Sequence, residues 1–93
     1  MAVTCKAEGR ALYAAIEGEV DHHRAREILR ELMGQLDLIM PRTLTLDLGG
    51  VSFMDSSGIA ILLRASRRMG ELEGRMEVIH VPEQAGKGLR AAG

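Results

Sequence analysis

Hydrophobic and polar residues alternate over two short stretches at the start of the chain. In residues 3–7 every second position is hydrophobic, and in the next stretch Leu12, Ala14 and Ile16 alternate with Tyr13, Ala15 and Glu17. This period is typical of strands that bury one face. Glu8-Gly9-Arg10 between them has the composition of a turn, so we predict an antiparallel hairpin. Gly18-Glu-Val-Asp21 then breaks the second strand.

The hydrophobic period changes to three and four residues further along the chain. Hydrophobic side chains recur at this spacing from Ala25 to Leu36, and charged side chains fill most of the positions opposite. The pattern predicts an amphipathic helix of about four turns. Asp21 is suited to accept from the free N–H groups of the first turn as an N-cap. Pro41 ends the helix or its trailing loop.

A strand and a second helix follow. Residues 43–48 alternate leucine with threonine and aspartate, which predicts a strand. Gly49-Gly50 and residues 52–56 predict a loop at its carboxyl end. A helix should then run from about Ser57 to Arg68. Residues 59–63 are all hydrophobic, so the first half of this helix should lie deep against the sheet.

The last third of the chain repeats this succession. Gly70 is suited to end the second helix, and Gly74 to the turn after it. Residues 75–81 predict a further strand, with Met76 and Val78 on one face. A last helix is expected over residues 84–91, although its two glycines disfavour helix.

The order of these elements predicts the fold class. Strands and helices alternate after an opening hairpin, which is typical of an α/β domain. We expect a mixed sheet of about four strands, with parallel neighbours joined by right-handed crossovers after the hairpin and with the helices packed on the sheet.

Composition narrows the classes of partner. The 93 residues carry a net charge of −1, which does not favour binding to nucleic acid or to an anionic membrane. No hydrophobic run approaches the roughly 20 residues of a membrane span, and the N-terminus does not resemble a signal peptide. Cys5 is the one cysteine and is expected to be a small core residue. A cytoplasmic location follows as the expectation.

The residues with candidate chemistry gather where the second helix should begin. The segment Asp55-Ser-Ser57 places two hydroxyls beside a carboxylate, and Ser57 would lie at the first turn. A phosphoryl group on Ser57 could be held there, because the free N–H groups and the aligned peptide dipoles favour an anion. The same side chains are also common helix caps, and their spacing alone favours that interpretation.

The histidines favour structural roles. Adjacent side chains on a helix point about 100° apart, so His22 and His23 are expected at the surface rather than on a shared metal ion. His80 is expected to be a hydrogen-bonded structural residue. Met54, beside the two serines, is a candidate for partner contact. We expect no metal and no cofactor.

Longer segments resemble a known family. Asp21-His-His23 after Gly18-Glu-Val20, Leu46-Asp-Leu48, and above all Val51-Ser-Phe-Met-Asp-Ser-Ser-Gly-Ile59 are similar to the STAS-domain anti-sigma-factor antagonists. The resemblance covers nearly the whole chain in the order of its elements.

The resemblance implies a phosphorylation switch. In that family the second serine of Asp-Ser-Ser-Gly, here Ser57, is phosphorylated by an anti-sigma factor that is also a serine kinase. The unphosphorylated form binds the anti-sigma factor and frees the sigma factor. Phosphorylation abolishes binding, and a PP2C-type phosphatase restores it. The implied partner-binding residues are Asp21, Met54, Asp55, Ser56, Ser57 and Gly58.

The resemblance also bears on the end of the chain. Residues 1–93 would form a single STAS domain, whereas family members usually continue past the position of Gly93 with another strand and a closing helix. The chain is then either a short member or one that has lost this segment. An exposed hydrophobic patch, a homodimer or a swapped element is then expected more readily than for a full-length relative.

Two other function classes are weighed against this one. A serine hydrolase would use Ser57 with a histidine and an aspartate, but the nucleophile elbow needs glycine two residues before the serine, and Asp55 stands there. A sensory STAS module could bind a small ligand or a nucleotide within a signalling assembly. Gly49-Gly50 is too short for a nucleotide fingerprint. We therefore expect a protein-binding module rather than an enzyme.

Overall fold

The computed structural model describes residues 3–83, which form one four-stranded sheet and two helices. The elements are β1 (Val3–Glu8), β2 (Ala11–Val20), α1 (His22–Ile39), β3 (Thr43–Met54), α2 (Ser56–Glu71) and β4 (Arg75–Ile79). The strand order is β1-β2-β3-β4. The β1–β2 pair is antiparallel, and the β2–β3 and β3–β4 pairs are parallel. The predicted α/β class and mixed sheet are confirmed, and the helix expected over residues 84–91 lies outside the described residues.

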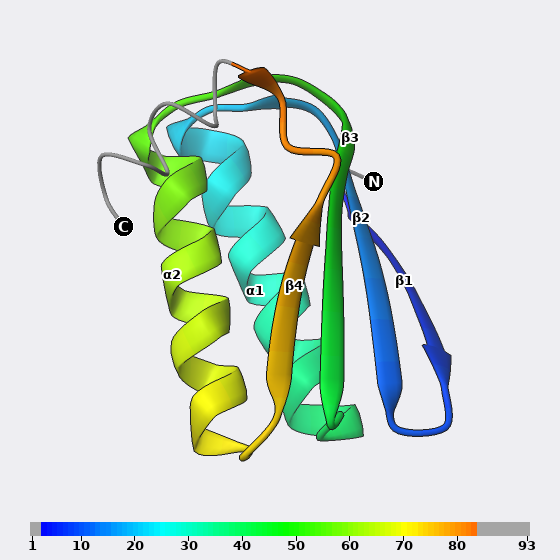
Figure 1. The fold of residues 1–93 in the computed structure, drawn as a ribbon. Helices are drawn as coiled ribbons and strands as arrows, with labels where there is room; N and C mark the ends of the chain where they lie inside the picture. Colours follow the sequence, from blue (N-terminus) through cyan, green and yellow to red (C-terminus); the bar gives the residue numbers. More distant parts are fainter. Residues whose placement is uncertain (1–2, 84–93) are drawn as a thin grey trace.

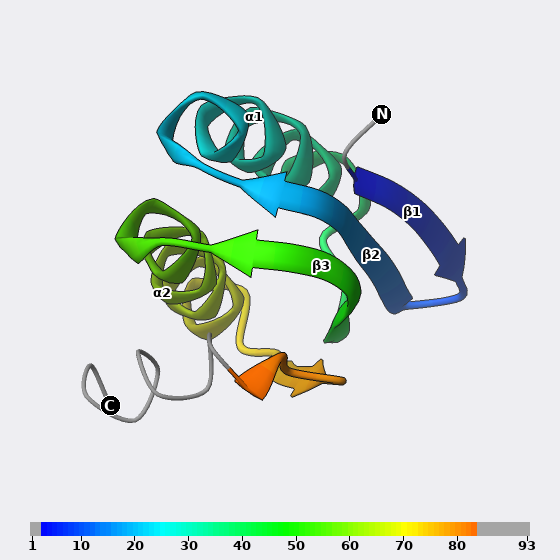
Figure 2. The same cartoon turned by 90° about the horizontal axis from the view of Figure 1, so that it is seen from above.

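Both helices cover the same face of the sheet (Figures 1 and 2). The core lies between the helices and that face of the sheet. The strands direct every second residue into it, and the helices every third or fourth residue. No polar or charged side chain is buried within residues 3–83. The fully buried side chains include Leu12, Ile16 and Val20 of β2, Leu44, Leu46, Leu48 and Met54 of β3, Ile28, Leu32 and Leu36 of α1, and Ile61 and Met69 of α2.

Strands β2 and β3 are longer than the sequence predicted. The expected break at Gly18-Glu-Val-Asp21 and the expected loop at Gly49-Gly50 and residues 52–56 are wrong, because β2 continues to Val20 and β3 to Met54. The register of the β2–β3 pair shifts between Ala15 and Glu17 and again between Gly18 and Glu19, which is the mark of β-bulges. The glycines permit these bulges. Gly18 has φ +85°, and a Cβ on Gly50 would come 2.8 Å from Glu17 Cγ. Glycine therefore extends this strand pair rather than ending it.

Helix α2 also differs in its extent and burial. It begins at Ser56 and continues through Gly70 to Glu71, so the stop expected at Gly70 is wrong. Leu63 is 56% exposed, and Ala60 is exposed as well, so the hydrophobic run is not buried on every side. Only the face with helical spacing, including Ile61 and Leu62, packs on the sheet.

The ends of the predicted elements shift elsewhere by a few residues. Helix α1 has 18 residues, about five turns rather than four. Strand β4 ends at Ile79, so His80 and Val81 lie beyond it. Cys5 is half-buried against the core, and this burial raises the pKa of its thiol. An unreactive core thiol is consistent with that environment.

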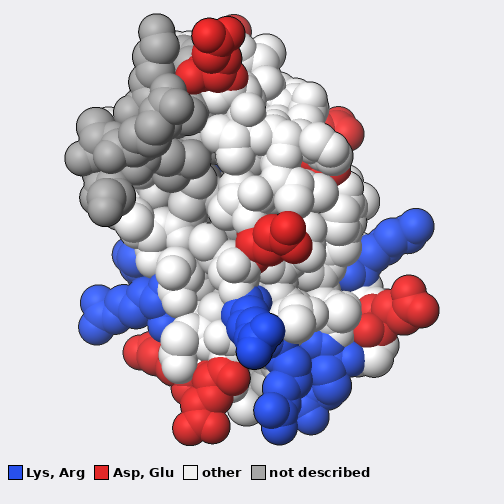
Figure 3. Space-filling model, in the orientation of Figure 1, with Lys and Arg blue, Asp and Glu red and all other residues white. Residues whose placement is uncertain are grey.

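In Figure 3, acidic and basic side chains lie next to one another over the lower part of the face shown. Neither of the two helices within residues 3–83 is long and hydrophobic enough to cross a membrane.

Candidate functional site

The carboxyl ends of β2 and β3 lie side by side. Val20 and Met54, the last residues of the two strands, are register partners. The backbone N–H of Asp55 donates to the carbonyl oxygen of Val20 at 3.3 Å. Because each strand is followed at once by its helix, the first turns of α1 and α2 become neighbours.

An aspartate caps each of these helices. Asp21 Oδ1 accepts from the N–H of Arg24 at 2.9 Å, and Asp55 Oδ1 accepts from the N–H of Ser57 at 2.8 Å. Both caps have extended backbone, as N-cap residues normally do. The hydrogen bond from the Arg24 N–H, which favours the charged carboxylate, lowers the pKa of Asp21. The predicted cap at Asp21 is confirmed, and at α2 the capping role belongs to Asp55.

Ser56 and Ser57 lie inside the first turn of α2. Ser56 is exposed, and Ser57 is only partly buried. Ser57 Oγ lies 3.3 Å from Nδ1 of His22, which is the first residue of α1. Ser57 therefore lies at the start of a helix, as the sequence predicted, and its hydroxyl is near the surface.

The structure corrects the role expected of Met54. Its side chain is 1% exposed and belongs to the core, whereas the neighbouring Phe53 is 43% exposed. Strand alternation causes this difference, because β3 continues through both residues. Met54 cannot offer its side chain to a partner, and Phe53 can.

Gly58 is buried, and its place depends on having no side chain. A Cβ there would come 2.3 Å from Met54 Cγ and 3.1 Å from Val20 Cγ1. The glycine thus lets the first turn of α2 lie directly on the ends of both strands. Of the six predicted partner-binding residues, Asp21 and Ser56 are exposed, Asp55 and Ser57 are partly buried, and Gly58 and Met54 are buried below them.

A second polar cluster lies on the sheet around Asp47. Tyr13 donates its hydroxyl hydrogen to Asp47 Oδ2, the N–H of Gly49 donates to Oδ1 at 2.8 Å, and His80 Nδ1 lies 2.9 Å from Oδ1. These hydrogen bonds, that of Tyr13 first, lower the pKa of Asp47 to about 2. The Tyr13–Asp47 hydrogen bond also raises the pKa of Tyr13. The hydrogen-bonding contact of His80 with Asp47 agrees with the structural role expected of His80. The whole cluster links β2, β3 and the residue after β4.

The geometry does not assemble a hydrolase triad within residues 3–83. His22 faces Ser57, but Asp21 and Asp55 direct their carboxylates to backbone N–H groups. The other histidine–aspartate pair, His80 with Asp47, lies in the separate cluster. In the described part of the chain, no three histidine, cysteine or acidic side chains gather as metal ligands do.

Comparison with known proteins assigns the chain to a family. The sequence pattern of the STAS domain matches residues 3–93. The anti-sigma F factor antagonist of Lysinibacillus sphaericus is 34% identical over 58 residues, which are 62% of this chain and 50% of the relative. The match thus spans about half the length of this curated relative.

Solved structures share the fold. The Bacillus cell-fate determinant SpoIIAA in its phosphorylated form superimposes with a TM-score of 0.82 at 22% identity, covering 99% of this chain and 84% of SpoIIAA. Its unphosphorylated form gives a TM-score of 0.86 at 22% identity, covering 98% and 80%. The murine solute carrier 26 family member A9, an anion transporter, gives 0.78 at 17% identity, covering 95% of this chain and 14% of the transporter.

Proposed function

Because the chain belongs to the STAS-domain family, we propose that it is an anti-sigma-factor antagonist whose affinity for its partner depends on phosphorylation of Ser57. The observation that carries the proposal is the position of the Ser57 hydroxyl, partly exposed in the first turn of α2 beside a second helix start. The unphosphorylated chain binds an anti-sigma factor and thereby frees the sigma factor. The protein acts in the cytoplasm and needs no nucleic acid or membrane contact of its own.

The partner is also the kinase in this proposal. It transfers the γ-phosphoryl group of ATP to Ser57 Oγ, so that ADP leaves and the hydroxyl proton is released. A PP2C-type phosphatase later hydrolyses the phosphoester and restores binding. The chain itself contributes an accessible hydroxyl and a docking surface, and no catalytic group.

Two relatives support the proposal. The L. sphaericus relative is an anti-sigma F factor antagonist, and SpoIIAA is an anti-sigma factor antagonist with phosphorylated and unphosphorylated forms. Both forms of SpoIIAA superimpose on this chain with TM-scores of 0.82 and 0.86. Because the phosphorylated and the unphosphorylated form both superimpose on this chain, they favour a switch in which phosphorylation leaves the fold intact.

The proposed docking face surrounds the two helix starts. It consists of Asp21, Phe53, Asp55, Ser56 and Ser57. Phe53 takes the place that the sequence suggested for Met54, because Phe53 is the exposed hydrophobic side chain of the two. Gly58 and Met54 act from below, since they set the height of the first turn of α2 over the strands.

Electrostatics explains why a phosphoryl group would oppose docking. It adds about −1.5 to −2 charges, two residues from Asp55. Burying that anion against a partner costs desolvation, and any acidic group opposite adds repulsion. A combined loss of a few kcal/mol corresponds to roughly 10- to 1,000-fold in affinity.

The test mixes the purified protein with candidate anti-sigma kinases, with and without ATP. Complex formation is measured by calorimetry and the phosphosite by mass spectrometry. Ser57→Ala should bind and remain unlabelled, whereas Ser56→Ala, the matched neighbouring hydroxyl, should be labelled like wild type. Labelling of Ser57→Ala at Ser56 would contradict the assignment.

A second candidate is a sensory or scaffold module that binds a small ligand or nucleotide. The match to 14% of an anion transporter supports it at the level of the fold alone, because the same fold there belongs to a different kind of protein. Saturable nucleotide binding to the isolated chain, without any effect of Ser57 phosphorylation on partner binding, would favour this alternative. Ester hydrolysis that disappears in Ser57→Ala would support the weaker hydrolase hypothesis.

A further inference from the structure

An open hollow between α1 and α2 begins at Ser57. Its polar lining consists of His22 and Arg26 from α1 and of Ser57 and Arg64 from α2, and its floor is hydrophobic, with Leu29 and Ile61 among the lining residues. Three of the four polar side chains are therefore cationic or can become so. The hydroxyl that we propose as the phosphosite shares this hollow with them.

The two arginines of this hollow have no ion-pair partner among residues 3–83. The positions three and four residues away on either side of Arg26 and of Arg64 hold no carboxylate, so neither helix supplies one at interacting distance. An exposed arginine pair without counter-charges attracts an anion.

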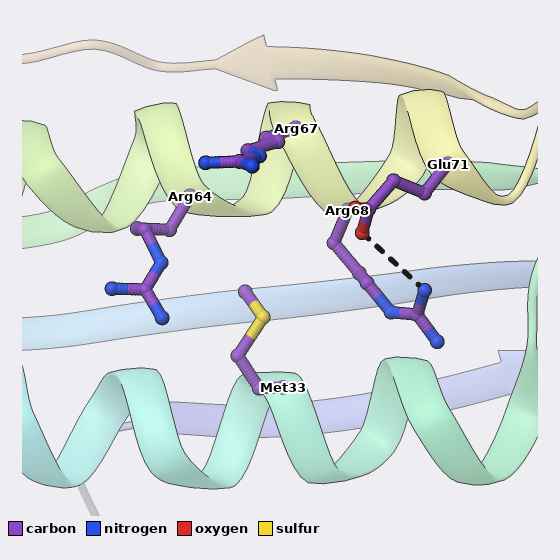
Figure 4. A pocket seen from close by; sticks show the side chains of 5 residues that line it. All are labelled: Met33, Arg64, Arg67, Arg68 and Glu71. Carbon is purple, nitrogen blue, oxygen red and sulfur yellow. Dashed lines mark hydrogen bonds and ion pairs between the residues drawn. The ribbon is translucent and has the colours of Figure 1, made fainter.

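The hollow continues as a groove between α1 and α2, and further along this groove the arginine charge is paired. Arg68 is paired with Asp37 at 3.0 Å and with Glu71 at 3.4 Å. Figure 4 shows the Arg68–Glu71 contact, with Arg64 reaching from α2 towards α1 and Arg67 staying alongside α2. Positive charge without a partner is thus directed into the groove at the end that holds Ser57.

Distances along the helices bring these cations within reach of a group on Ser57. His22 Nδ1 is already 3.3 Å from Ser57 Oγ. Arg26 follows His22 by one turn of α1, and Arg64 follows Ser57 by two turns of α2, a rise of about 10 Å. Helical side chains lean towards the N-terminus of their helix, which here means towards Ser57. A long arginine side chain and a phosphoryl group can span that separation together.

We propose that His22, Arg26 and Arg64 form a receptor for the phosphoryl group of phosphorylated Ser57 within the same chain. This inference rests on the proposed function, whose regulation it specifies. The guanidinium groups donate charge-assisted hydrogen bonds to the phosphate oxygens, and the imidazole donates a further one. The opposing charges nearby are Asp21 and Asp55, whose carboxylates are engaged with backbone N–H groups.

The receptor changes what the switch does to the surface. The phosphoryl group is drawn over the mouth of the groove and takes up its free cations, instead of projecting into solvent. Phosphorylation then closes the Ser57 end of the α1–α2 groove in addition to adding charge. A partner that uses this end meets a covered surface.

The test needs no kinase. Phosphoserine is introduced at position 57 during translation, and its second ionisation is followed by ³¹P NMR in the native protein and in denaturant. We expect the native midpoint to lie about half a pH unit or more below the unfolded one, because nearby cations favour the dianion. The double variant Arg26→Gln/Arg64→Gln should abolish most of this shift, and His22→Gln should reduce it.

The matched control is Arg67→Gln, which removes an arginine from the same helix that lines the adjacent hollow and not the one at Ser57. It should retain the wild-type shift. Equal midpoints in native and unfolded protein would overturn the proposal, as would a shift that survives the double variant, since the start of α2 alone would then account for it.

Failure of the receptor and failure of the proposed function are distinguishable. A midpoint shift that depends on both arginines, with partner binding indifferent to phosphorylation, would uphold the receptor and remove the antagonist switch. Partner binding that depends on phosphorylation, without any midpoint shift, would uphold the antagonist switch and remove the receptor.

Discussion

Met54 and Gly58 lie so close that a Cβ on the glycine would come 2.3 Å from the methionine Cγ. The residues come from different elements, the end of β3 and the first turn of α2. This contact sets the position of the Ser57 hydroxyl, because Ser57 is the immediate neighbour of Gly58. The absence of a side chain at residue 58 is therefore part of the site.

Gly58→Ala should destabilise the fold. The new methyl group overpacks the junction, which typically costs about 1–3 kcal/mol in the free energy of unfolding. Gly70→Ala is the matched control, because Gly70 lies in the same helix and a Cβ added there would meet nothing within 4 Å. It should be neutral or stabilising by up to about 1 kcal/mol. Urea unfolding of both variants compares them, and equal effects would contradict the close contact.

Substitution at residues 53 and 54 separates the core from the docking face. Met54→Leu conserves volume in the core, so it should cost less than about 1.5 kcal/mol of stability and leave affinity for the proposed anti-sigma-factor partner unchanged. Phe53→Ala should weaken that affinity, because it removes an exposed aromatic side chain from the proposed face. Calorimetric titration of both variants with the partner checks this. The reverse ranking would show that Met54 reaches the partner.

Each aspartate cap should contribute similarly to stability. Asp55→Ala and Asp21→Ala both leave a first-turn N–H without its acceptor, at a cost of about 1 kcal/mol each. Thermal or urea unfolding measures the loss. Asp55→Asn should recover most of it, because asparagine also caps. An Asn variant as unstable as the Ala variant would indicate that Asp55 acts by its charge rather than by its hydrogen bond.

The sequence predicted the parts of this site that depend on local period and missed those that depend on pairing. The hairpin, the cap at Asp21 and the placement of Ser57 follow from alternation and spacing. Gly18 and Gly50 looked like breaks, because a glycine in a bulge and one in a loop have the same sequence signature. The contact of His22 with Ser57 requires the register of Val20 with Met54. Only the preference of parallel strand ends for one edge of a sheet could have suggested it.

Acid should destabilise the protein through Asp47. Its pKa in the folded chain is about 2, whereas an unfolded aspartate titrates near 3.9. The unfolded state thus binds the proton first as pH falls, so the stability contributed by Asp47 is present above about pH 4 and is lost between there and about pH 2.

Tyr13→Phe tests this assignment, because the Tyr13 hydroxyl is the largest cause of the lowered pKa of Asp47. The variant should raise the pKa of Asp47 towards its ordinary value, as read from the carboxyl ¹³C shift in an NMR titration. The acid-unfolding midpoint should rise with it. An unchanged titration of Asp47 in Tyr13→Phe would show that the tyrosine does not hold this carboxylate.

The proposed switch itself is tested most directly by the affinity of one anti-sigma factor for two forms of this protein, unmodified and carrying phosphoserine at position 57. Calorimetry at one ionic strength should give a dissociation constant at least about tenfold larger for the phosphorylated form, with both forms folded by circular dichroism. Equal dissociation constants for the two folded forms would contradict the proposed switch.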